Sequence, residues 1–215
     1  MRVAIAGGHG GIGLRLTRLL SGRGDEVLAL IRNPDHSGDV REAGGEPVLC
    51  DLEAADVREV EAAIGSADAV VFAAGAGPGS GSARKETMDY GGAVKLAAAA
   101  TAAGVARYVM VSSMGADPDV QGDDTFSVYL RAKGRADAEL TASGLDYTIV
   151  RPGRLTDEPG TGRVRLGEGV PRGAVPRDDV AAALAEILHA PATVGANLGL
   201  TSGDTPVAEA VASPE

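Results

Sequence analysis

Short runs of apolar residues alternate along the chain with longer segments in which apolar residues recur at helical spacing. The apolar runs have the length of strands and lie at residues 3–6, 27–31, 47–50, 69–73, 108–112 and 147–150. The segments with helical spacing lie between them, at residues 11–21, 34–43, 56–64, 87–103 and 127–143. Strands that are apolar throughout are typical of a sheet covered on both faces. The alternation therefore predicts a doubly wound α/β fold of three layers, with a mostly parallel sheet in the middle.

The pattern changes after residue 151. Residues 159–176 are rich in Gly and Pro and hold one short alternating run at 163–166, and a helix at 177–189 and a strand at 197–201 are predicted to follow. We predict a single domain, 1–215, in which residues 152–176 cap the carboxyl ends of the strands, where open α/β sheets bind ligands. The polar segment 203–215 is predicted to be a frayed tail.

The composition of the chain limits the kinds of molecule that the protein is expected to bind. The chain has 20 basic and 30 acidic side chains and a net charge of -10, which argues against nucleic acid and anionic membranes as partners. It has one cysteine, a short first apolar run unlike that of a signal peptide, and no uninterrupted apolar stretch of about 18 residues. We therefore expect a cytoplasmic protein that binds a small-molecule substrate. No metal site is predicted, and the oligomeric state stays open.

A glycine cluster follows the first predicted strand. Residues 7–13 read Gly-Gly-His-Gly-Gly-Ile-Gly, which contains the spacing G-x-x-G-x-x-G and leads into the first helix. Glycines in this position let the backbone turn sharply and approach a pyrophosphate, which a helix N-terminus then binds with its free N–H groups. A tight turn without any ligand is the alternative. The order of strand, glycines and helix favours a Rossmann-type dinucleotide site. The residues expected to contact the cofactor here are Gly7, Gly8, His9, Gly10, Gly11 and Ile12.

The end of the second strand bears on the choice of cofactor. NAD-binding sites usually place an acidic residue about 20 positions beyond the glycines, whereas an arginine there accommodates the 2′-phosphate of NADP. Arg32 lies 19 positions after Gly13 and is followed by Asn33, with no acidic residue before Asp35. NADP is therefore predicted as the cofactor, with NAD as the alternative. The structural alternative is that Arg32 is only a solvated surface side chain. His9 would add a second positive partner.

Asp51 and Leu52 follow the third predicted strand. A carboxylate there lies near the adenine pocket of such a fold, where it would accept a hydrogen bond from the exocyclic amine. An equally weighted alternative is that Asp51 caps the N-terminus of the next helix.

Tyr129 and Lys133 lie four residues apart and so share one face of the predicted helix 127–143. An ammonium beside a phenol favours the phenolate, which suits the pair to acid/base catalysis. Ser112 and Ser113 end the fifth strand, and a hydroxyl there can hold the oxygen that exchanges the proton. Packing of Tyr129 and capping of the strand end by the serines are the structural alternatives.

Together these motifs resemble the short-chain dehydrogenases/reductases, and more specifically their atypical, NmrA-like NAD(P)-binding subgroup. Residues 88–93, 111–113 and 149–153 add to the resemblance, which covers about residues 1–200. It implies a seven-stranded Rossmann sheet. It also implies that Tyr129 is the general acid/base, that Lys133 holds the nicotinamide ribose and tunes Tyr129, and that Ser113 orients the substrate oxygen.

The resemblance also assigns the remaining cofactor contacts. Ala73, Ala74 and Gly75 would line the adenosine ribose, and Pro152 would abut the nicotinamide. Asp89 departs from the family, which has a catalytic asparagine in its proton relay at this position.

Three functions are compatible with these features. The first is an NADP-dependent oxidoreductase that moves a hydride between nicotinamide and a small carbonyl or quinone-type substrate. The second is a non-catalytic, NmrA-like redox sensor. A sugar-nucleotide epimerase is the third and is disfavoured, because only about 60 residues follow Arg151 to build a substrate domain.

Overall fold

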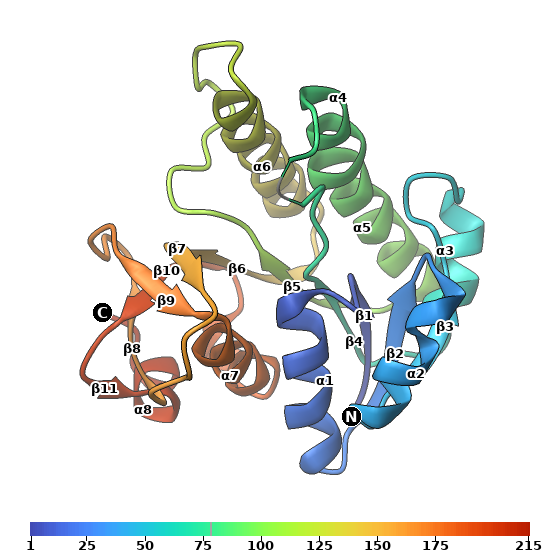
Figure 1. The fold of residues 1–215 in the computed structure, drawn as a ribbon, viewed down its shortest axis with the longest axis horizontal. Helices are drawn as coiled ribbons and strands as arrows, with labels where there is room; N and C mark the ends of the chain where they lie inside the picture. The colour runs from blue at the N-terminus through green and yellow to red at the C-terminus, as the bar shows by residue number, and fades with distance from the viewer. Residues whose placement is uncertain (78) are drawn as a thin grey trace.

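A mostly parallel sheet with helices on both faces organises the chain, in a computed structural model that describes residues 1–77 and 79–215 (Figure 1). The strands, in sheet order, are β11 (Thr205–Pro206), β8 (Arg163–Gly167), β10 (Ala196–Ser202), β6 (Asp146–Pro152), β5 (Arg107–Val111), β4 (Ala69–Phe72), β1 (Arg2–Ala6), β2 (Glu26–Ile31) and β3 (Glu46–Leu49). In this order, every two neighbouring strands from β10 to β3 are parallel. The doubly wound α/β fold predicted from the alternation is therefore confirmed.

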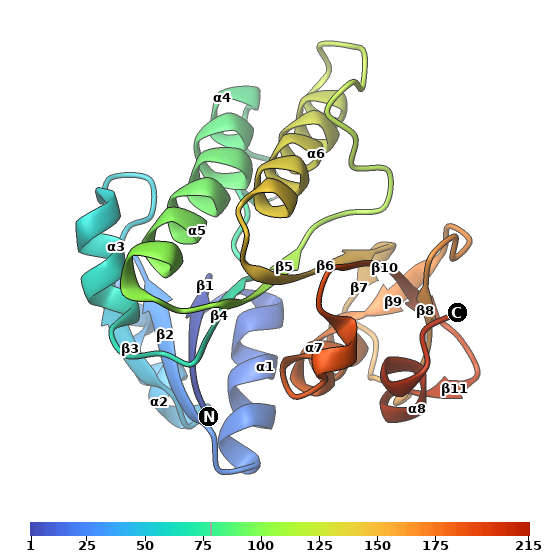
Figure 2. The same ribbon diagram turned by 180° about the vertical axis from the view of Figure 1, so that it is seen from behind.

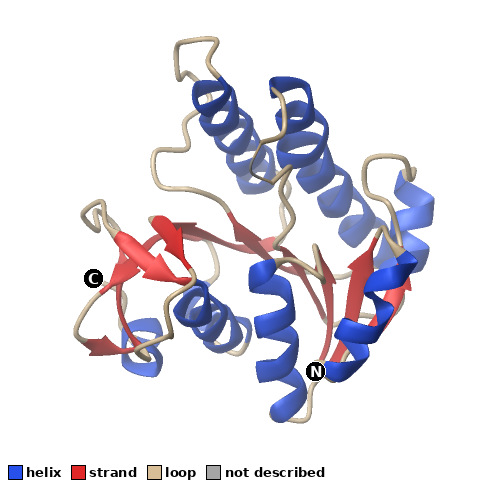
Figure 3. Cartoon of the chain, in the orientation of Figure 1, coloured by secondary structure: helices blue, strands red, loops and turns tan. Residues whose placement is uncertain are grey.

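Two helical layers enclose the sheet, as the view from behind and the colouring by secondary structure make plain (Figures 2 and 3). One layer contains α1 (Gly11–Gly22), α2 (Ser37–Glu42), α7 (Arg177–Leu188) and α8 (Val207–Ala212). The other contains α3 (Val57–Ile64), α5 (Gly91–Ala103) and α6 (Thr125–Ala142). The central strands β1, β4 and β5 therefore bury side chains on both sides, which explains why their apolar runs are continuous.

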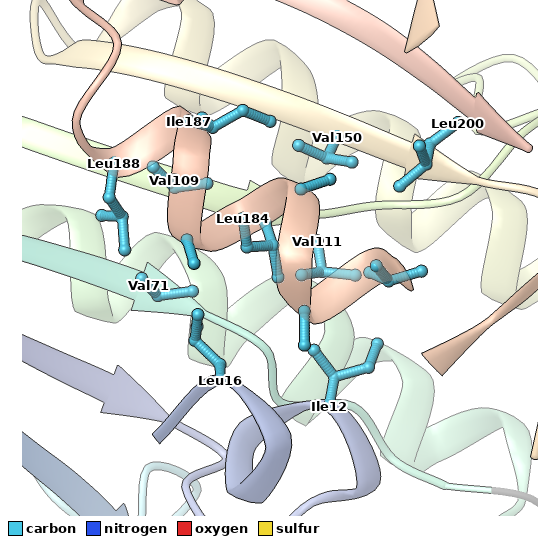
Figure 4. Close-up of a cluster of buried hydrophobic side chains, with 14 of the residues drawn as sticks. Ile12, Leu16, Val71, Val109, Val111, Val150, Leu184, Ile187, Leu188 and Leu200 are labelled. Carbon is cyan, nitrogen blue, oxygen red and sulfur yellow. The ribbon is translucent and has the colours of Figure 1, made fainter. Parts of the chain in front are cut away.

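The two cores receive alternate residues of the same strands. In β5, Val109 and Val111 belong to the core under α1 and α7, whereas Tyr108 and Met110 belong to the core under α5 and α6. Figure 4 shows the first core, where side chains of the central strands meet α1 and α7. Full burial of such aliphatic side chains stabilises the fold by about 1.5–3 kcal/mol each.

The sheet is larger than the resemblance implies. Seven strands form its parallel part, but β8 pairs antiparallel with β10, and β11 pairs antiparallel with β8. The run 163–166 was predicted within the cap, yet Val164 and Leu166 are buried in the α7 core and β8 widens the main sheet. The rest of the predicted cap contains a small parallel pair, β7 (Arg154–Thr156) and β9 (Ala174–Pro176). This pair adjoins the end of β10, where the Gly153 amide donates to the Leu200 carbonyl over 2.9 Å.

The prediction of a frayed tail is wrong. Residues 203–215 contain β11 and α8, and α8 buries Val207, Ala210 and Val211 against the rest of the core. These three residues have helical i, i+3, i+4 spacing, a signal too short to stand out in a polar segment. The backbone of Glu215 then pairs with the end of β8, accepting from the Glu168 amide over 3.0 Å and donating to the Leu166 carbonyl over 2.9 Å.

Two predicted helices have irregular first turns. The helix predicted at 34–43 begins as the 3₁₀ turn η1 (Pro34–His36) before α2, and α5 is preceded by α4 (Ser82–Arg84) and by a π-helical turn, η2 (Lys85–Tyr90). A further 3₁₀ turn, η3 (Pro191–Thr193), follows α7. The π turn carries two of its charged side chains, Lys85 and Asp89, into buried positions. Throughout the described ranges, every helix is too short or too polar to cross a membrane.

Candidate functional site

The glycine turn between β1 and α1 packs too closely for side chains. Gly7 has φ +82°, and a Cβ atom there would lie 2.7 Å from the Cα of Ala74. A Cβ at Gly13 would lie 2.2 Å from the Gly7 carbonyl oxygen, to which the Gly10 amide donates over 2.8 Å. The first and last glycines of the motif therefore bring β1, α1 and the end of β4 into contact, as the dinucleotide-binding turn requires.

The N-terminus of α1 has no side-chain cap. Gly10 caps the helix without a side-chain hydrogen bond, so the first N–H groups keep their partial positive charge. Two guanidinium groups lie close by: Arg15 donates to the Gly11 carbonyl over 2.7 Å, and the Arg177 side chain lies against Gly11. Sequence reasoning missed Arg177, because it comes from the start of α7, 166 positions after Gly11.

A cavity of about 300 Å³ lies at the carboxyl ends of β1, β2, β3 and β4, within the size range of small-molecule sites. Nine of the predicted cofactor contacts line it: Gly7, His9, Gly10, Arg32, Asp51, Leu52, Ala73, Ala74 and Gly75. Its wall is completed by residues that the sequence motifs did not indicate: Leu30, Ile31, His36, Cys50, Ala76, Gly77, Arg84 and Met88. The ends of four strands that are neighbours in the sheet thus meet at one site, although they are far apart in the sequence.

Several predicted contacts lie outside this wall for local reasons. A Cβ at Gly8 would lie 2.6 Å from the Ala29 Cβ, so this glycine allows the turn to pack on β2. Ile12 is in the core, and Gly11 faces Arg177. The Asn33 side chain accepts from the Asp35 amide over 3.1 Å and caps η1.

The rim at the end of β2 carries a group of cationic and imidazole side chains. The rings of His9 and His36 are stacked, with centroids 3.6 Å apart, and His9 Nε2 lies 2.7 Å from Asp39 Oδ2. Arg32 is largely exposed, and its nearest carboxylate oxygen, on Glu53, is 3.8 Å away. The Arg32 guanidinium is therefore held only loosely and is accessible from the cavity.

Glu53 joins this rim to the π turn. Its carboxylate accepts from Arg84 Nε over 2.9 Å and from the Thr87 hydroxyl over 2.7 Å. Partial burial raises the pKa of Glu53, but the hydrogen bonds from Arg84 and Thr87 and the charge of Arg32 outweigh it and lower the pKa overall. Glu53 thus stays ionised and offsets the charge of Arg84.

Asp51 does not cap the helix that follows it. The N-cap of α3 is Asp56, which forms a capping box with Glu59. Asp51 instead accepts from the Glu53 amide over 3.0 Å in a turn, and its residue lines the cavity. The helix-cap interpretation is therefore wrong, and the position is compatible with contact to an adenine.

A stripe of side chains on α6 anchors that helix to the end of β5. Asp137 accepts from the Ser112 hydroxyl and from Arg151 Nε, both over 2.9 Å. Burial raises the pKa of Asp137 overall, although the hydrogen bonds from Ser112 and Arg151 oppose the rise. One turn earlier on the helix, Lys133 Nζ donates to the Val111 carbonyl over 3.0 Å. Tyr129 lies one further turn toward the N-terminus of α6, about 6 Å along its axis.

Lys133 is paired with the residue that departs from the family pattern. Its ammonium lies 3.5 Å from Asp89 Oδ1, and both side chains are almost fully buried. The other oxygen of Asp89 accepts from the Ala76 amide over 3.2 Å, and Ala76 is part of the cavity wall. Lys133 therefore forms a buried ion pair beside the cavity, and its contact with a nicotinamide ribose stays a prediction.

The ring of Tyr129 has two neighbours that the motifs did not indicate. Lys85 Nζ is 5.4 Å from the centroid of the Tyr129 ring, and the centroid of the Phe126 ring is 6.1 Å away. No hydrogen bond within residues 1–77 and 79–215 involves the Tyr129 hydroxyl. Ser113 precedes Met114, whose amide donates to the Pro152 carbonyl over 3.0 Å, so the predicted Ser113 and Pro152 meet at one loop. These residues do not line the 300 Å³ cavity.

The glycine turn, the helix N-terminus and the cavity at the strand ends define a dinucleotide-binding Rossmann protein. A sequence profile described as NAD(P)H-binding matches residues 7–191. The chain belongs to this NAD(P)H-binding family, in agreement with the resemblance to atypical short-chain dehydrogenases/reductases.

Known relatives span the whole chain. An uncharacterised sugar epimerase of Bacillus subtilis, YhfK, is 39% identical over 98% of this chain and 99% of its own. A solved structure from Bacillus halodurans, described as a candidate NAD-dependent epimerase/dehydratase, is 40% identical, with a TM-score of 0.91 and 98% coverage of both chains. ChuY of Escherichia coli O157:H7, an anaerobillin reductase, is 27% identical, with a TM-score of 0.78 over 94% of this chain and 97% of its own.

Proposed function

We propose that this protein is an NADP-dependent oxidoreductase that transfers a hydride between nicotinamide and a small carbonyl or quinone-type substrate. The observation that carries the proposal is the rim at the end of β2, where Arg32, His9 and His36 surround the place at which NAD-binding sites carry a carboxylate. An arginine at this place suits the 2′-phosphate of NADP, since its fork of N–H donors matches phosphate oxygens. The reductase activity of the related ChuY agrees with this class of reaction.

The residues of the chain fit the pyrophosphate and the adenosine end of such a cofactor. The glycine turn allows the close backbone packing that a dinucleotide-binding turn requires, and the N-terminus of α1, which has no side-chain cap, would bind the pyrophosphate. Arg32 would hold the 2′-phosphate, and Asp51 would accept from the adenine amine. When bound, NADPH supplies the hydride that reduces the substrate's carbonyl carbon.

The remaining step, protonation of the substrate oxygen, falls to Tyr129. The residue is half-buried, and its hydroxyl has no hydrogen-bond partner within the described ranges, so the hydroxyl is available to a substrate. Tyr129 Oη would give its proton to the carbonyl oxygen, and the Ser113 hydroxyl would orient that oxygen. Lys133 would position α6 through its bond to Val111, while Asp89 balances its charge.

A second candidate function is favoured by that same ion pair. If Asp89 neutralises Lys133, the tyrosine lacks the cation that the family places beside it, and the protein would bind NADP without turnover as a redox sensor. The cofactor site serves both candidates equally.

Two titrations and one turnover assay test the proposal. We expect wild-type protein to bind NADPH at least about tenfold tighter than NADH, and Arg32→Gln to abolish the preference while Arg41→Gln, an exposed change on α2, preserves it. Equal or tighter binding of NADH by the wild type would contradict NADP dependence. With NADPH and a panel of quinones and aldehydes, Tyr129→Phe should lower kcat by about 100-fold or more, and Tyr90→Phe should not. Turnover that survives Tyr129→Phe would remove Tyr129 from the mechanism, and intact binding without any turnover would favour the sensor.

A further inference from the structure

The chain contains only three lysines, and all three are at least half-buried. Lys133 is paired with Asp89. Lys95 donates to three backbone carbonyls, those of Leu52, Glu53 and Ala55. In the part of the chain that the structure describes, Lys85 has a single hydrogen bond, to the Gly77 carbonyl over 3.1 Å. Lys85 is thus the lysine whose hydrogen-bonding capacity is least used.

The charge of Lys85 is also uncompensated. Its residue is only 8% exposed, yet within residues 1–77 and 79–215 no carboxylate lies within 4.0 Å of its ammonium. A nearly buried cation normally has an anionic partner, because removing the charge from water is unfavourable. The ring of Tyr129, 5.4 Å away, offsets this only in part. The absence of a counter-ion is notable in a chain with ten more acidic than basic side chains.

Lys85 lies between the wall of the 300 Å³ cavity and Tyr129. It opens the π turn η2, whose Met88 lines the cavity, and its acceptor Gly77 lines the cavity as well. Its ammonium also lies over the ring of Tyr129, which is stacked with the ring of Phe126, and Phe126 is 62% exposed although it is a large apolar residue. An exposed aromatic ring and a cation without a carboxylate partner in the described ranges thus lie beside the ring of the tyrosine proposed to protonate the substrate.

We propose that Lys85 binds an anionic group of the substrate, and that the substrate is a flat, conjugated carbonyl compound bearing a carboxylate or a comparable anion. Lys85 is then a specificity-determining residue, with Phe126 contacting the flat part of the ligand. The identity of the site as a substrate site rests on the proposed oxidoreductase function, but recognition of the anion can be measured without turnover.

The test uses a matched pair of unreactive ligands, 2-naphthoate and its methyl ester, titrated calorimetrically into the protein saturated with NADP⁺. The pair differs in charge and shares the aromatic part. We expect the acid to bind about tenfold or more tighter than the ester, Lys85→Met to reduce the ratio to about one, and Lys85→Arg to retain most of it. The control is Arg135→Gln. Arg135 lies on the same helix as Tyr129 and is paired with Glu86, and removing this cation should leave the ratio unchanged.

Equal binding of acid and ester by the wild type, no binding of the acid, or a ratio that survives Lys85→Met would overturn the proposal. If Lys85→Met does not fold, reductive ¹³C-methylation of the wild type gives one dimethyl-lysine signal for each of three lysines. The signal assigned through Lys85→Arg should shift with 2-naphthoate and not with the ester, and the opposite result refutes the proposal. Charge discrimination without NADPH-dependent turnover would defeat the proposed function alone, whereas turnover without discrimination would defeat this inference alone.

Discussion

The cofactor cavity and the corner around Tyr129 are built by different means. The cavity is shaped largely by backbone: glycines and alanines at the ends of β1 and β4 approach so closely that a side chain at Gly7 would collide with Ala74. The corner is shaped by buried charge, with Lys133 on Asp89 and Arg151 on Asp137. A site made of backbone tolerates little change in shape, whereas a site made of ion pairs tolerates little change in charge.

The largest effect on stability is expected when the buried ion pair between Lys133 and Asp89 is broken. Asp89→Ala leaves the Lys133 ammonium without a counter-ion in a nearly dry position, which should destabilise the protein by about 3–5 kcal/mol and lower Tm on the order of 10 °C. The double variant Asp89→Leu/Lys133→Met should recover much of the loss, because it removes both charges. Thermal unfolding followed by circular dichroism measures both. An Asp89→Ala protein as stable as the wild type would show that the corner does not depend on this pair.

A smaller effect is expected in the backbone-built cavity. Gly7→Ala forces a side chain into a left-handed conformation, at about 1–2 kcal/mol, and places its Cβ against Ala74, so we expect lower Tm and loss of NADPH binding. Gly22→Ala is the matched control, because Gly22 is helical and nothing lies within 4 Å of the place that a Cβ would occupy there. That change should stabilise the protein by about 0.5–1 kcal/mol and leave binding intact. Unchanged NADPH affinity in Gly7→Ala would mean that the cofactor does not need this turn.

The smallest effect concerns the ion pair between Arg15 and Asp178, which joins α1 to α7. The hydrogen bond from Arg15 lowers the pKa of Asp178. Because the pKa is lower in the folded state, the pair stabilises the fold above the unfolded pKa, near 4, and that contribution is lost as the pH falls through the folded pKa. Asp178 is partly exposed, so Asp178→Asn should lower Tm by only about 1–3 °C at pH 7 and by less below pH 4.

Asp123→Asn provides the reference for that measurement, since Asp123 is exposed and makes no ion pair within the described ranges. A Tm difference for Asp178→Asn that stays constant from pH 7 to pH 3 would assign the effect to packing rather than to charge.

The sequence indicated many of the residues that line the cavity because they follow strands directly. Gly7, Arg32 and Ala73 each come immediately after the last residue of β1, β2 and β4, and parallel strands bring those ends together. Periodicity therefore indicated the fold, while the glycine motif, Arg32 and the family resemblance indicated nine of the residues that line the cavity.

The missed features depend on side-chain contacts between distant segments. The stacking of His36 on His9 and the proximity of Arg177 to Gly11 follow from how α2 and α7 pack, which no local motif encodes. The spacing of Tyr129 and Lys133 showed that they share a helical face, but it could not show that the π turn brings Asp89 to the lysine and Lys85 to the tyrosine. A π turn leaves almost no sequence signal.

The two outermost strands of the sheet have a further property in common. β3 contains Pro47 and β11 contains Pro206, and these strands are four and two residues long. Proline cannot donate a hydrogen bond to an added strand, and short edges offer few other donors. Neither margin of this wide sheet is therefore a good template for a strand of another molecule, which protects the protein against edge-to-edge aggregation.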